Sequence, residues 1–267
     1  MRGRAELIDV SQASDARIYS FLLGGSDHYG ADREAVRCLL DVVPNARQLA
    51  RINRQFLVKA VRYLAGACDI GQFLDHGAGL PMPRNNVHQV ARRANPAARV
   101  VYIDHDPVVL AHARMMVDDA HTLILDADML DTGHILATSR QAGFLKRDAA
   151  VGALFLCALH CIADERNPWQ RVTDLMDQLP SGSCLVLSHL VSDDAALREE
   201  ASRLMRRLTG RQWARVRSRA EVERFFDGLE PVGGPIGDVA RWRPGTDLKL
   251  PLPEAAWIIY GGIARKP

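Results

Sequence analysis

The sequence predicts an α/β protein with a doubly wound, mostly parallel sheet, an antiparallel last strand and a helical addition at the N-terminus. Two observations predict this architecture. From Gln72 onward, short apolar runs alternate with helix-compatible stretches, whereas the residues before it carry only helical patterns. The apolar runs are continuous, as in parallel strands that helices cover on both faces. Right-handed crossovers between such strands place ligands at the carboxyl ends of the sheet.

The first third of the chain is predicted to form three helices. One is expected over residues 14–23, where two glycines end it, and a second over residues 32–42. The third has the clearest pattern, with apolar residues at helical spacing: Leu49, Ile52, Phe56, Leu57, Ala60, Val61 and Leu64. We therefore divide the chain into an N-terminal helical cap over residues 1–68 and a core domain over residues 69–267.

Five apolar runs are predicted to form the parallel strands: QFLDHG, ARVVYID, TLILDAD, AVGALFLCAL and SCLVLSHL. Helices are expected between them over residues 86–94, 107–118 and 168–178. The tail adds a polar helix over residues 193–208 and another after the capping box of Ser218 and Glu221. The last apolar run, AAWIIYGGIA, suits a final strand inserted antiparallel beside its neighbour.

The composition is that of an ordinary globular protein. The 267 residues are 48% hydrophobic and 25% charged, which favours a folded core over disorder. The net charge of +2, from 34 basic and 32 acidic residues, is too balanced for a dedicated nucleic-acid binder. No apolar run reaches the roughly 20 residues that span a bilayer, and the N-terminus has no apolar signal core. Five cysteines do not make a disulfide framework in such a chain, so we expect a cytoplasmic protein with reduced thiols.

The segment FLDHGAGLP is the most informative part of the chain. Gly77 and Gly79 form a tight loop after a strand, and their backbone can approach a ligand closely. The third glycine of a G-x-G-x-x-G motif is absent, because Met82 stands there between two prolines. In dinucleotide-binding folds that glycine helps to bring a helix N-terminus to a pyrophosphate. Here the helix is expected to begin only at Asn85 or Asn86, which suits a cofactor without a pyrophosphate.

Three carboxylates are predicted at the carboxyl ends of three successive strands. Asp75 ends the first strand, Asp104 the second and Asp128 the third. A carboxylate at Asp104 can accept both hydroxyls of a ribose, and Asp128 would lie near an adenine edge. The set repels phosphates and favours a cofactor with a ribose, an amino-bearing base and a positive centre. S-adenosylmethionine meets each condition. In the alternative, each aspartate only caps a helix or closes a turn.

With these residues in view, the chain resembles an actinobacterial family of S-adenosylmethionine-dependent methyltransferases that was first catalogued as a domain of unknown function. The resemblance runs from about residue 13 to the end and rests on these segments: ARIYSFLLGGSDHYGADREA, ARINRQFLVKAVRYLA, QFLDHGAGLP, ARVVYIDHDPVVLAHA, LHCIAD, LPSGSCLVLSHLVSD, RSRAEVERFFDGLEPV and YGGIARKP. It implies a Rossmann-like class I methyltransferase fold whose N-terminal helices close over the cofactor. The chain departs from the family at His76, where an aliphatic residue is more usual, and in its longer LPMPRNN loop.

The resemblance also implies which residues hold the cofactor. Gly77 and Gly79 would lie along its methionine part, Asp104 at the ribose and Asp128 on the adenine side. The N-terminal motif that helps to form the pocket contributes Gly25, Asp27 and Tyr29. The predicted cofactor site is completed by these residues: Asp75, Ala78, His105, Met129 and Asn53.

Methyl transfer from a sulfonium is an in-line displacement, in which positioning does most of the work. A base is needed only when the acceptor must lose a proton. His160, at the end of the fourth strand, is the first candidate base, and His189, at the end of the fifth, is the second. Each is alternatively a histidine that only holds its loop. Asp164 either orients one of them or caps the helix near Pro168.

Several other polar residues allow two interpretations. Asn53 falls in the apolar stripe of the third helix, so its amide needs a partner in the cofactor, the substrate or the neighbouring backbone. Tyr19 either lines the pocket or packs in the core. The segment CALHC is not predicted to bind a metal, because a fourth ligand is missing. The arginines of residues 203–219 bind RNA or an acidic acceptor, or form a solvated helix face.

The sequence therefore predicts an enzyme that transfers a methyl group from S-adenosylmethionine to an oxygen or nitrogen of a small molecule. A non-catalytic or non-methylating S-adenosylmethionine binder is the alternative, and a nicotinamide-dependent oxidoreductase is less favoured because the third glycine is missing. A nucleic-acid methyltransferase is disfavoured, since ALHC stands where an N/D-P-P-Y/F tetrapeptide would flank an extruded base. We expect no membrane partner, and a homodimer is compatible with the chain.

Overall fold

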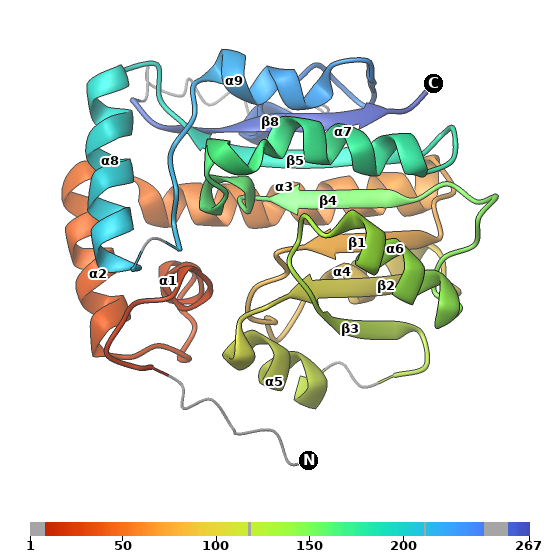
Figure 1. Ribbon diagram of the computed structural model, residues 1–267, viewed down its shortest axis with the longest axis horizontal. Helices are drawn as coiled ribbons and strands as arrows, with labels where there is room; N and C mark the ends of the chain where they lie inside the picture. The colour runs from red at the N-terminus through yellow and green to blue at the C-terminus, as the bar shows by residue number, and fades with distance from the viewer. Residues whose placement is uncertain (1–8, 117–118, 211, 243–255) are drawn as a thin grey trace.

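The structure, a computed structural model, describes residues 9–116, 119–210, 212–242 and 256–267 (Figure 1). Its strands are β1 (Gln72–His76), β2 (Arg99–Asp104), β3 (Thr122–Asp126), β4 (Gly152–Leu156), β5 (Cys184–Val191), β6 (Glu230–Pro231), β7 (Gly237–Asp238) and β8 (Ile258–Arg265). They form one sheet in the order β3-β2-β1-β4-β5-β8-β6, with β7 paired to β8. Strands β1 to β5 are parallel to their neighbours, whereas β8 is antiparallel to β5. The predicted doubly wound sheet with an antiparallel last strand is confirmed.

Helices cover both faces of this sheet. The α-helices are α1 (Asp15–Leu22), α2 (Gly30–Val42), α3 (Ala46–Ala67), α4 (Val87–Ala94), α5 (Pro107–Met116), α6 (Thr132–Gln141), α7 (Pro168–Gln178), α8 (Ala195–Leu208) and α9 (Arg219–Glu223). The 3₁₀ helices are η1 (Leu159–Cys161), η2 (Asp164–Arg166), η3 (Arg224–Phe226) and η4 (Val239–Arg241). Helices α3 and α4 lie behind the sheet and α6 and α7 in front of it (Figure 1). Helix α6 was not predicted from the sequence, because Thr, Ser and Gly interrupt its apolar pattern.

Local capping explains where the helices begin. Asn86 caps α4 together with the side chain of Gln89, so the late helix start after the glycine loop is confirmed. Helix α2 begins two residues earlier than predicted, because Asp32 accepts a hydrogen bond from the backbone N–H of Tyr29 at 2.7 Å. Asp194 is itself the N-cap of α8, and its side chain accepts the N–H groups of Ala196 and Leu197. The predicted end of the helix over residues 107–118 and the predicted start of the last strand at Ala255 lie outside the described residues. Arg211, one of the arginines of the basic stretch, also lies outside them.

The fourth strand is shorter than its apolar run suggests. β4 ends at Leu156, and Cys157 adopts a φ of +52°, a left-handed conformation that turns the chain out of the sheet. Only the last residue of the run, Leu159, belongs to a helix, because it begins the 3₁₀ helix η1. The prediction that His160 ends a strand is therefore wrong: its side chain comes from a turn above the sheet edge.

The N-terminal helices and the sheet share a hydrophobic core. Leu49, Phe56 and Leu64 of α3 are buried in one cluster with Phe73 of β1 and Val186 of β5. Helix α1 packs against both α2 and α3, which places it over the carboxyl edge of the strands (Figure 1). The division of the chain at residue 68 stays a prediction. Within the described ranges, no helix is both long and apolar enough to cross a membrane.

Candidate active site

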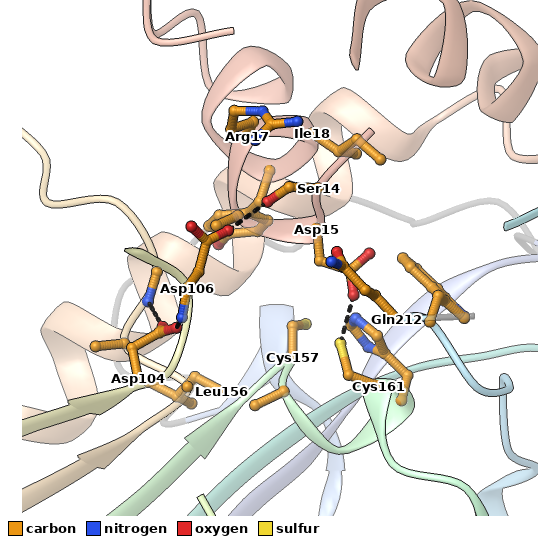
Figure 2. Close-up of a pocket in the computed structure, with 18 of the residues that line it drawn as sticks. Ser14, Asp15, Arg17, Ile18, Asp104, Asp106, Leu156, Cys157, Cys161 and Gln212 are labelled. Atoms are coloured by element: carbon orange, nitrogen blue, oxygen red, sulfur yellow. Dashed lines mark hydrogen bonds between the residues drawn. The ribbon is translucent and has the colours of Figure 1, made fainter. Parts of the chain in front are cut away.

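A cavity of about 620 Å³ lies between the carboxyl ends of the strands and the N-terminal helices. Its floor includes the loop after β1 and the ends of β2 and β4, and its roof includes α1 and α3. Figure 2 shows Asp104 and Asp106 on one side of it, and Asp15 and Cys161 on the other. The volume falls in the range of small-molecule and cofactor sites. The fold thus positions a ligand site where a doubly wound sheet is expected to have one.

The glycine loop forms a part of the floor that carries no side chain. Gly77 and Gly79 have φ angles of +69° and +66°, which disfavour any residue with a Cβ. The N–H groups of Gly77 and Ala78 donate to the carbonyl of Ile103, which holds the loop against β2. A Cβ on Gly77 would lie 2.9 Å from the Ala158 Cβ. The glycines therefore keep open the space that a bound molecule would use.

Asp104 ties the glycine loop to the end of β2. Its Oδ2 accepts the N–H of Gly79 at 2.9 Å, and its Oδ1 accepts the N–H groups of His105 and Asp106 at 2.8 and 3.0 Å. Burial raises the pKa of the Asp104 carboxyl, and these backbone hydrogen bonds oppose the rise. Oδ1 thus accepts two donors already, whereas Oδ2 can accept one more. The carboxylate that was predicted to bind a ribose thus also shapes the loop beside it.

The other two predicted carboxylates differ in their surroundings. Asp75 is buried near the end of β1, and burial raises its pKa to about 7, with attraction to Arg54 opposing the rise and repulsion from Asp104 adding to it. Asp128 lies two residues beyond the end of β3 and forms an ion pair with Arg166 at 2.7 Å. The carboxylate that was predicted on the adenine side therefore already has an arginine partner, from a segment that follows β4.

His76 supports this half of the cavity from behind. Its ring stacks on Phe155 with ring centroids 4.2 Å apart, and its Nδ1 is 2.9 Å from the carbonyl oxygen of Met129, a cavity residue. The imidazole does not itself line the cavity. His76, in place of the usual aliphatic residue, therefore adds a hydrogen bond that positions the Asp128–Met129 segment.

The burial of His76 predicts a pH-dependent stability. Burial lowers the pKa of the imidazole to about 4. Below its ordinary pKa of about 6.5 the unfolded chain takes up a proton that the folded chain does not, so stability falls as the pH falls from about 6.5 to 4. Between pH 7 and pH 5, wild type should lose about 2 kcal/mol of unfolding free energy relative to His76→Phe. Urea unfolding of both proteins measures this difference, in which all other titrating groups cancel. A pH-independent difference would contradict a buried, neutral His76.

Asn53 is part of a buried chain of hydrogen bonds. Its Nδ2 donates to the hydroxyl of Tyr19 at 2.8 Å, and its Oδ1 accepts from Ser188 at 2.6 Å. The Tyr19 hydroxyl donates to the carbonyl of Ala50 at 3.2 Å. Burial raises the pKa of the Tyr19 phenol, so it stays protonated. Asn53 and Tyr19 both line the cavity, but the partners of the Asn53 amide are side chains of α1 and β5 rather than the neighbouring backbone.

His160 reaches the cavity from η1. Its ring stacks on Trp213 with ring centroids 4.0 Å apart and meets His189 edge-on at 5.6 Å. Burial and then repulsion from Arg217 lower the pKa of His160 to about 3, so the ring is neutral near pH 7. Its Nδ1 is buried and has no hydrogen-bond partner among the described residues. The first predicted catalytic residue therefore lies in the cavity as a neutral imidazole.

His189 does not line the cavity, although the sequence made it the second catalytic candidate. It is completely buried in β5, and its Nδ1 is 2.7 Å from the carbonyl oxygen of Leu190. Burial lowers its pKa well below the ordinary value. Strand β5 extends to Val191, so His189 is covered by neighbouring elements instead of ending the strand. His189 is therefore not placed to contact a molecule bound in the cavity.

Arg217 is a residue whose role the sequence did not reveal. It was one of the arginines read as a solvated face, yet its side chain is completely buried. It donates to the carbonyls of Leu159 and Ile162 and to Asp164, at 2.6 to 2.7 Å. Asp164 therefore pairs with arginine, and neither a histidine nor the start of α7 uses it. Arg217 fixes the turn that presents His160 to the cavity.

Asp15 is a cavity residue that sequence reasoning missed. It begins α1, where an aspartate is an ordinary first-turn residue, and so gave no functional signal. In the structure its Oδ2 lies 2.8 Å from the Cys161 Sγ, and its Oδ1 is buried without a partner among the described residues. Burial raises the pKa of the Asp15 carboxyl to about 6, although the thiol hydrogen bond opposes the rise. The described part of the chain contains no group of three metal-ligating residues, here or elsewhere.

The structure gathers most of the predicted site residues around the cavity. Those that line it are Asn53, Asp75, Gly77, Ala78, Gly79, Asp104, His105, Asp128, Met129 and His160. Gly25, Asp27 and Tyr29 do not line it. A Cβ on Gly25 would lie 2.3 Å from the Ser20 Oγ, and Tyr29 caps α2. The N-terminal motif thus shapes the corner between α1 and α2 from which the cavity roof is built.

These observations define a class of protein. The residues present fit S-adenosylmethionine: the Gly77 position has no room for a side chain, carboxylates lie at the ends of β1 and β2, and the Asp104 Oδ2 can accept a further donor. Together with the parallel sheet and its antiparallel last strand, they define a class I S-adenosylmethionine-dependent methyltransferase.

Comparison with known proteins identifies the family. A family model described as S-adenosyl methyltransferase matches residues 1–267, and the chain belongs to this family. A solved DUF574 family protein from Streptomyces avermitilis MA-4680 is 34% identical, with 98% of this chain and 100% of that chain covered and a TM-score of 0.88. A protein from Thermobifida fusca YX, suggested to be a methyltransferase, is also 34% identical, with 97% and 96% covered and a TM-score of 0.87. The predicted membership in this actinobacterial family, the enzyme class and the cofactor are confirmed.

A more distant structure shares only the fold. The plantazolicin methyltransferase BpumL, solved with S-adenosylhomocysteine and a substrate analogue, is 11% identical, with 94% of this chain and 96% of that chain covered and a TM-score of 0.52. No curated protein matches the chain significantly.

Proposed function

We propose that this methyltransferase acts on a small molecule, at an oxygen or a nitrogen, inside the cavity under α1. The observation that carries the proposal is the continuity of the cavity. It runs from the glycine loop, beneath α1, to His160 and Trp213 on the far side. A volume of about 620 Å³ suits a cofactor together with a small acceptor. The homodimer and the cytoplasmic location that the sequence suggested remain predictions.

The residues divide into two groups by what they would contact. Gly77, Gly79 and Asp104 would bind the methionine part and the ribose of S-adenosylmethionine, which supplies the activated methyl group. The acceptor would then lie toward α1, where its attacking atom can align with the methyl carbon and the sulfur. His160, which lines the cavity, would contact the acceptor with its ring. Its lowered pKa makes it a weak base near pH 7, so we assign it a positioning and hydrogen-bonding role.

The cofactor half of the proposal predicts selective binding. S-adenosylmethionine and S-adenosylhomocysteine should both bind the purified protein in calorimetric titrations. NADH should give no heat, because its pyrophosphate would lie against Asp75, Asp104 and Asp106. Binding of NADH without binding of S-adenosylhomocysteine would overturn the assignment of the glycine loop.

The acceptor half is tested by following the methyl group. The protein is incubated with methyl-tritiated S-adenosylmethionine and a cell extract separated by dialysis into small molecules and macromolecules. We expect label in a small molecule other than S-adenosylmethionine itself, and none above background in such a product with His160→Ala. Label confined to protein or nucleic acid would contradict a small-molecule acceptor, and tight binding without any transfer would favour a non-catalytic binder.

A further inference from the structure

The part of the cavity away from the glycine loop has an apolar wall. We call it the acceptor chamber; it lies between helices α1 to α3 and the ends of β4, β5 and β8. Its aliphatic lining residues are Ile18, Leu22, Leu39, Val43, Leu49, Leu190 and Ile259. These side chains come from five different elements, so the chamber exists only in the folded chain. An apolar wall of this kind binds the hydrocarbon body of a ligand.

Asp15 introduces a charge into this apolar surrounding. It forms no ion pair with any described residue, whereas Arg17, the other charged α1 residue at the cavity, pairs with Asp32 at 2.8 Å. The hydrogen bond from Cys161 is its main polar contact. A buried carboxylate without a cation is costly unless a bound partner supplies one.

Two further polar atoms at the chamber are unsatisfied. The Nδ1 of His160 and the Nε1 of Trp213 are buried without hydrogen-bond partners among the described residues, as is the Oδ1 of Asp15. Both rings are 6% exposed, and all three residues line the cavity. Buried polar atoms in folded proteins are almost always paired. The Asp15 Oδ1 and the Nδ1 of a neutral His160 can each accept from a donor group of a ligand, whereas the Trp213 indole N–H can only donate and does not bear on such a group.

The charges around the cavity select the sign of that polar group. The remaining arginines of the lining, Arg54 and Arg166, already have partners: Arg54 donates to the Asn85 carbonyl and Arg166 pairs with Asp128. The described arginines of the lining thus have other hydrogen-bond partners, and an anionic acceptor that contacts Asp15 would face a carboxylate without an ion-pair partner at short range. A cation would replace the missing partner of Asp15. The geometry favours a positively charged group at this end of the chamber.

We propose that the acceptor is an amine with an apolar body, which enters the chamber as an ammonium ion and pairs with Asp15. The inference rests on the proposed methyltransferase function and narrows its acceptor to nitrogen. Asp15 takes one proton from the ammonium group, and the nitrogen lone pair becomes available. The nitrogen then forms a bond to the methyl carbon while the carbon–sulfur bond breaks and its electron pair goes to sulfur. The products are a methylated ammonium ion and S-adenosylhomocysteine, and Asp15 returns its proton to solvent.

The pKa of about 6 at Asp15 is compatible with this role, because the carboxyl is ionised at neutral pH and remains a usable proton acceptor. The groups that face it are Cys161, Asp106 and His105.

The experiment compares matched probes on the protein loaded with S-adenosylhomocysteine. Hexylamine, 1-hexanol and hexanoate differ only in the charge of their head group and are titrated calorimetrically. We expect hexylamine to bind about tenfold or more tightly than hexanol, as a charge-assisted hydrogen bond requires, and hexanoate not to bind. Asp15→Asn should reduce the preference for the amine to less than about threefold. The matched control is Asp9→Asn, an exposed aspartate of the same cavity mouth, which should keep the preference because solvent screens it.

The outcomes separate the inference from the function on which it rests. Absence of S-adenosylhomocysteine binding to wild type would refute the proposed function itself. Normal binding of S-adenosylhomocysteine, with hexylamine no tighter than hexanol or not bound at all, overturns the amine inference alone. An amine preference that survives in Asp15→Asn, with S-adenosylhomocysteine bound as in wild type, also overturns it. Retained binding of S-adenosylhomocysteine by Asp15→Asn shows that the variant is folded.

Discussion

Replacing Arg17 by methionine is expected to lower the free energy of unfolding by about 3–5 kcal/mol, since it leaves a buried carboxylate without its cation. The Arg17 Nε lies 2.8 Å from the Asp32 Oδ2, and the two side chains are 4% and 0% exposed. Asp32 also accepts the N–H groups of Ser14 and Tyr29, so it joins the starts of α1 and α2. Loss of the pair should therefore loosen the roof of the cavity. Chemical denaturation of the apo protein measures the effect.

Two companion variants make the Arg17 result interpretable. Arg37→Met removes an arginine of α2 that pairs with Glu34 at the surface, where it is 65% exposed, and should change stability by less than about 0.5 kcal/mol. Arg17→Met combined with Asp32→Asn should recover part of the loss, because the buried charge is gone as well. A change as small in Arg17→Met as in Arg37→Met would show that the Arg17–Asp32 pair is not desolvated.

Asp104→Ala is expected to weaken binding of S-adenosylhomocysteine by about 2–3 kcal/mol, or about 30- to 150-fold. Two effects add. The Asp104 Oδ2 would lose its charge-assisted bond to a ribose hydroxyl, and the N–H of Gly79 would lose the acceptor that holds the glycine loop against β2. Calorimetric titration of wild type and variant gives the ratio of dissociation constants.

Asp126→Ala is the matched control for Asp104→Ala. Asp126 ends β3 directly beside Asp104 in the strand register, but it is exposed and does not line the cavity. Its removal should leave cofactor affinity within a factor of about two, because exposed charges interact weakly with a neighbouring site. Equal affinities for Asp104→Ala and wild type would show that the ribose lies elsewhere.

The cofactor half of the site was largely predictable from the sequence. The glycine loop, Asp75 and Asp104 are close in sequence to strand ends that have a strong local pattern, and parallel strands bring their carboxyl ends to one edge. Asp128 differs from the prediction in two ways. It does not end β3, which stops two residues earlier at Asp126, and its carboxylate pairs with Arg166, which is 38 residues away in the sequence. A pattern in one segment does not show which side chain from another segment will neutralise it.

Most of the acceptor half of the site could not be predicted from sequence patterns. His160 was found because it follows an apolar run, but its place on a turn depends on the left-handed Cys157. His189 follows a similar run and lies outside the cavity, because β5 continues past it. Arg217 looked like part of a solvated basic stretch, yet the carbonyls of a distant turn hold it in the core. These outcomes depend on packing between elements, for which the sequence carries no local signal.

The sequence alone determined the five parallel strands, the antiparallel last strand, the glycine loop and the family, because each of these is encoded in the periodicity or the residue order of a contiguous segment. The tertiary structure alone decided the chemistry of the acceptor chamber. Asp15 meets Cys161 across 146 residues, and Ser188 meets Asn53 across 135. Whether a carboxylate is buried, paired or free to hold a ligand depends on which distant side chains fold around it, since desolvation and ion pairing act through space and not along the chain.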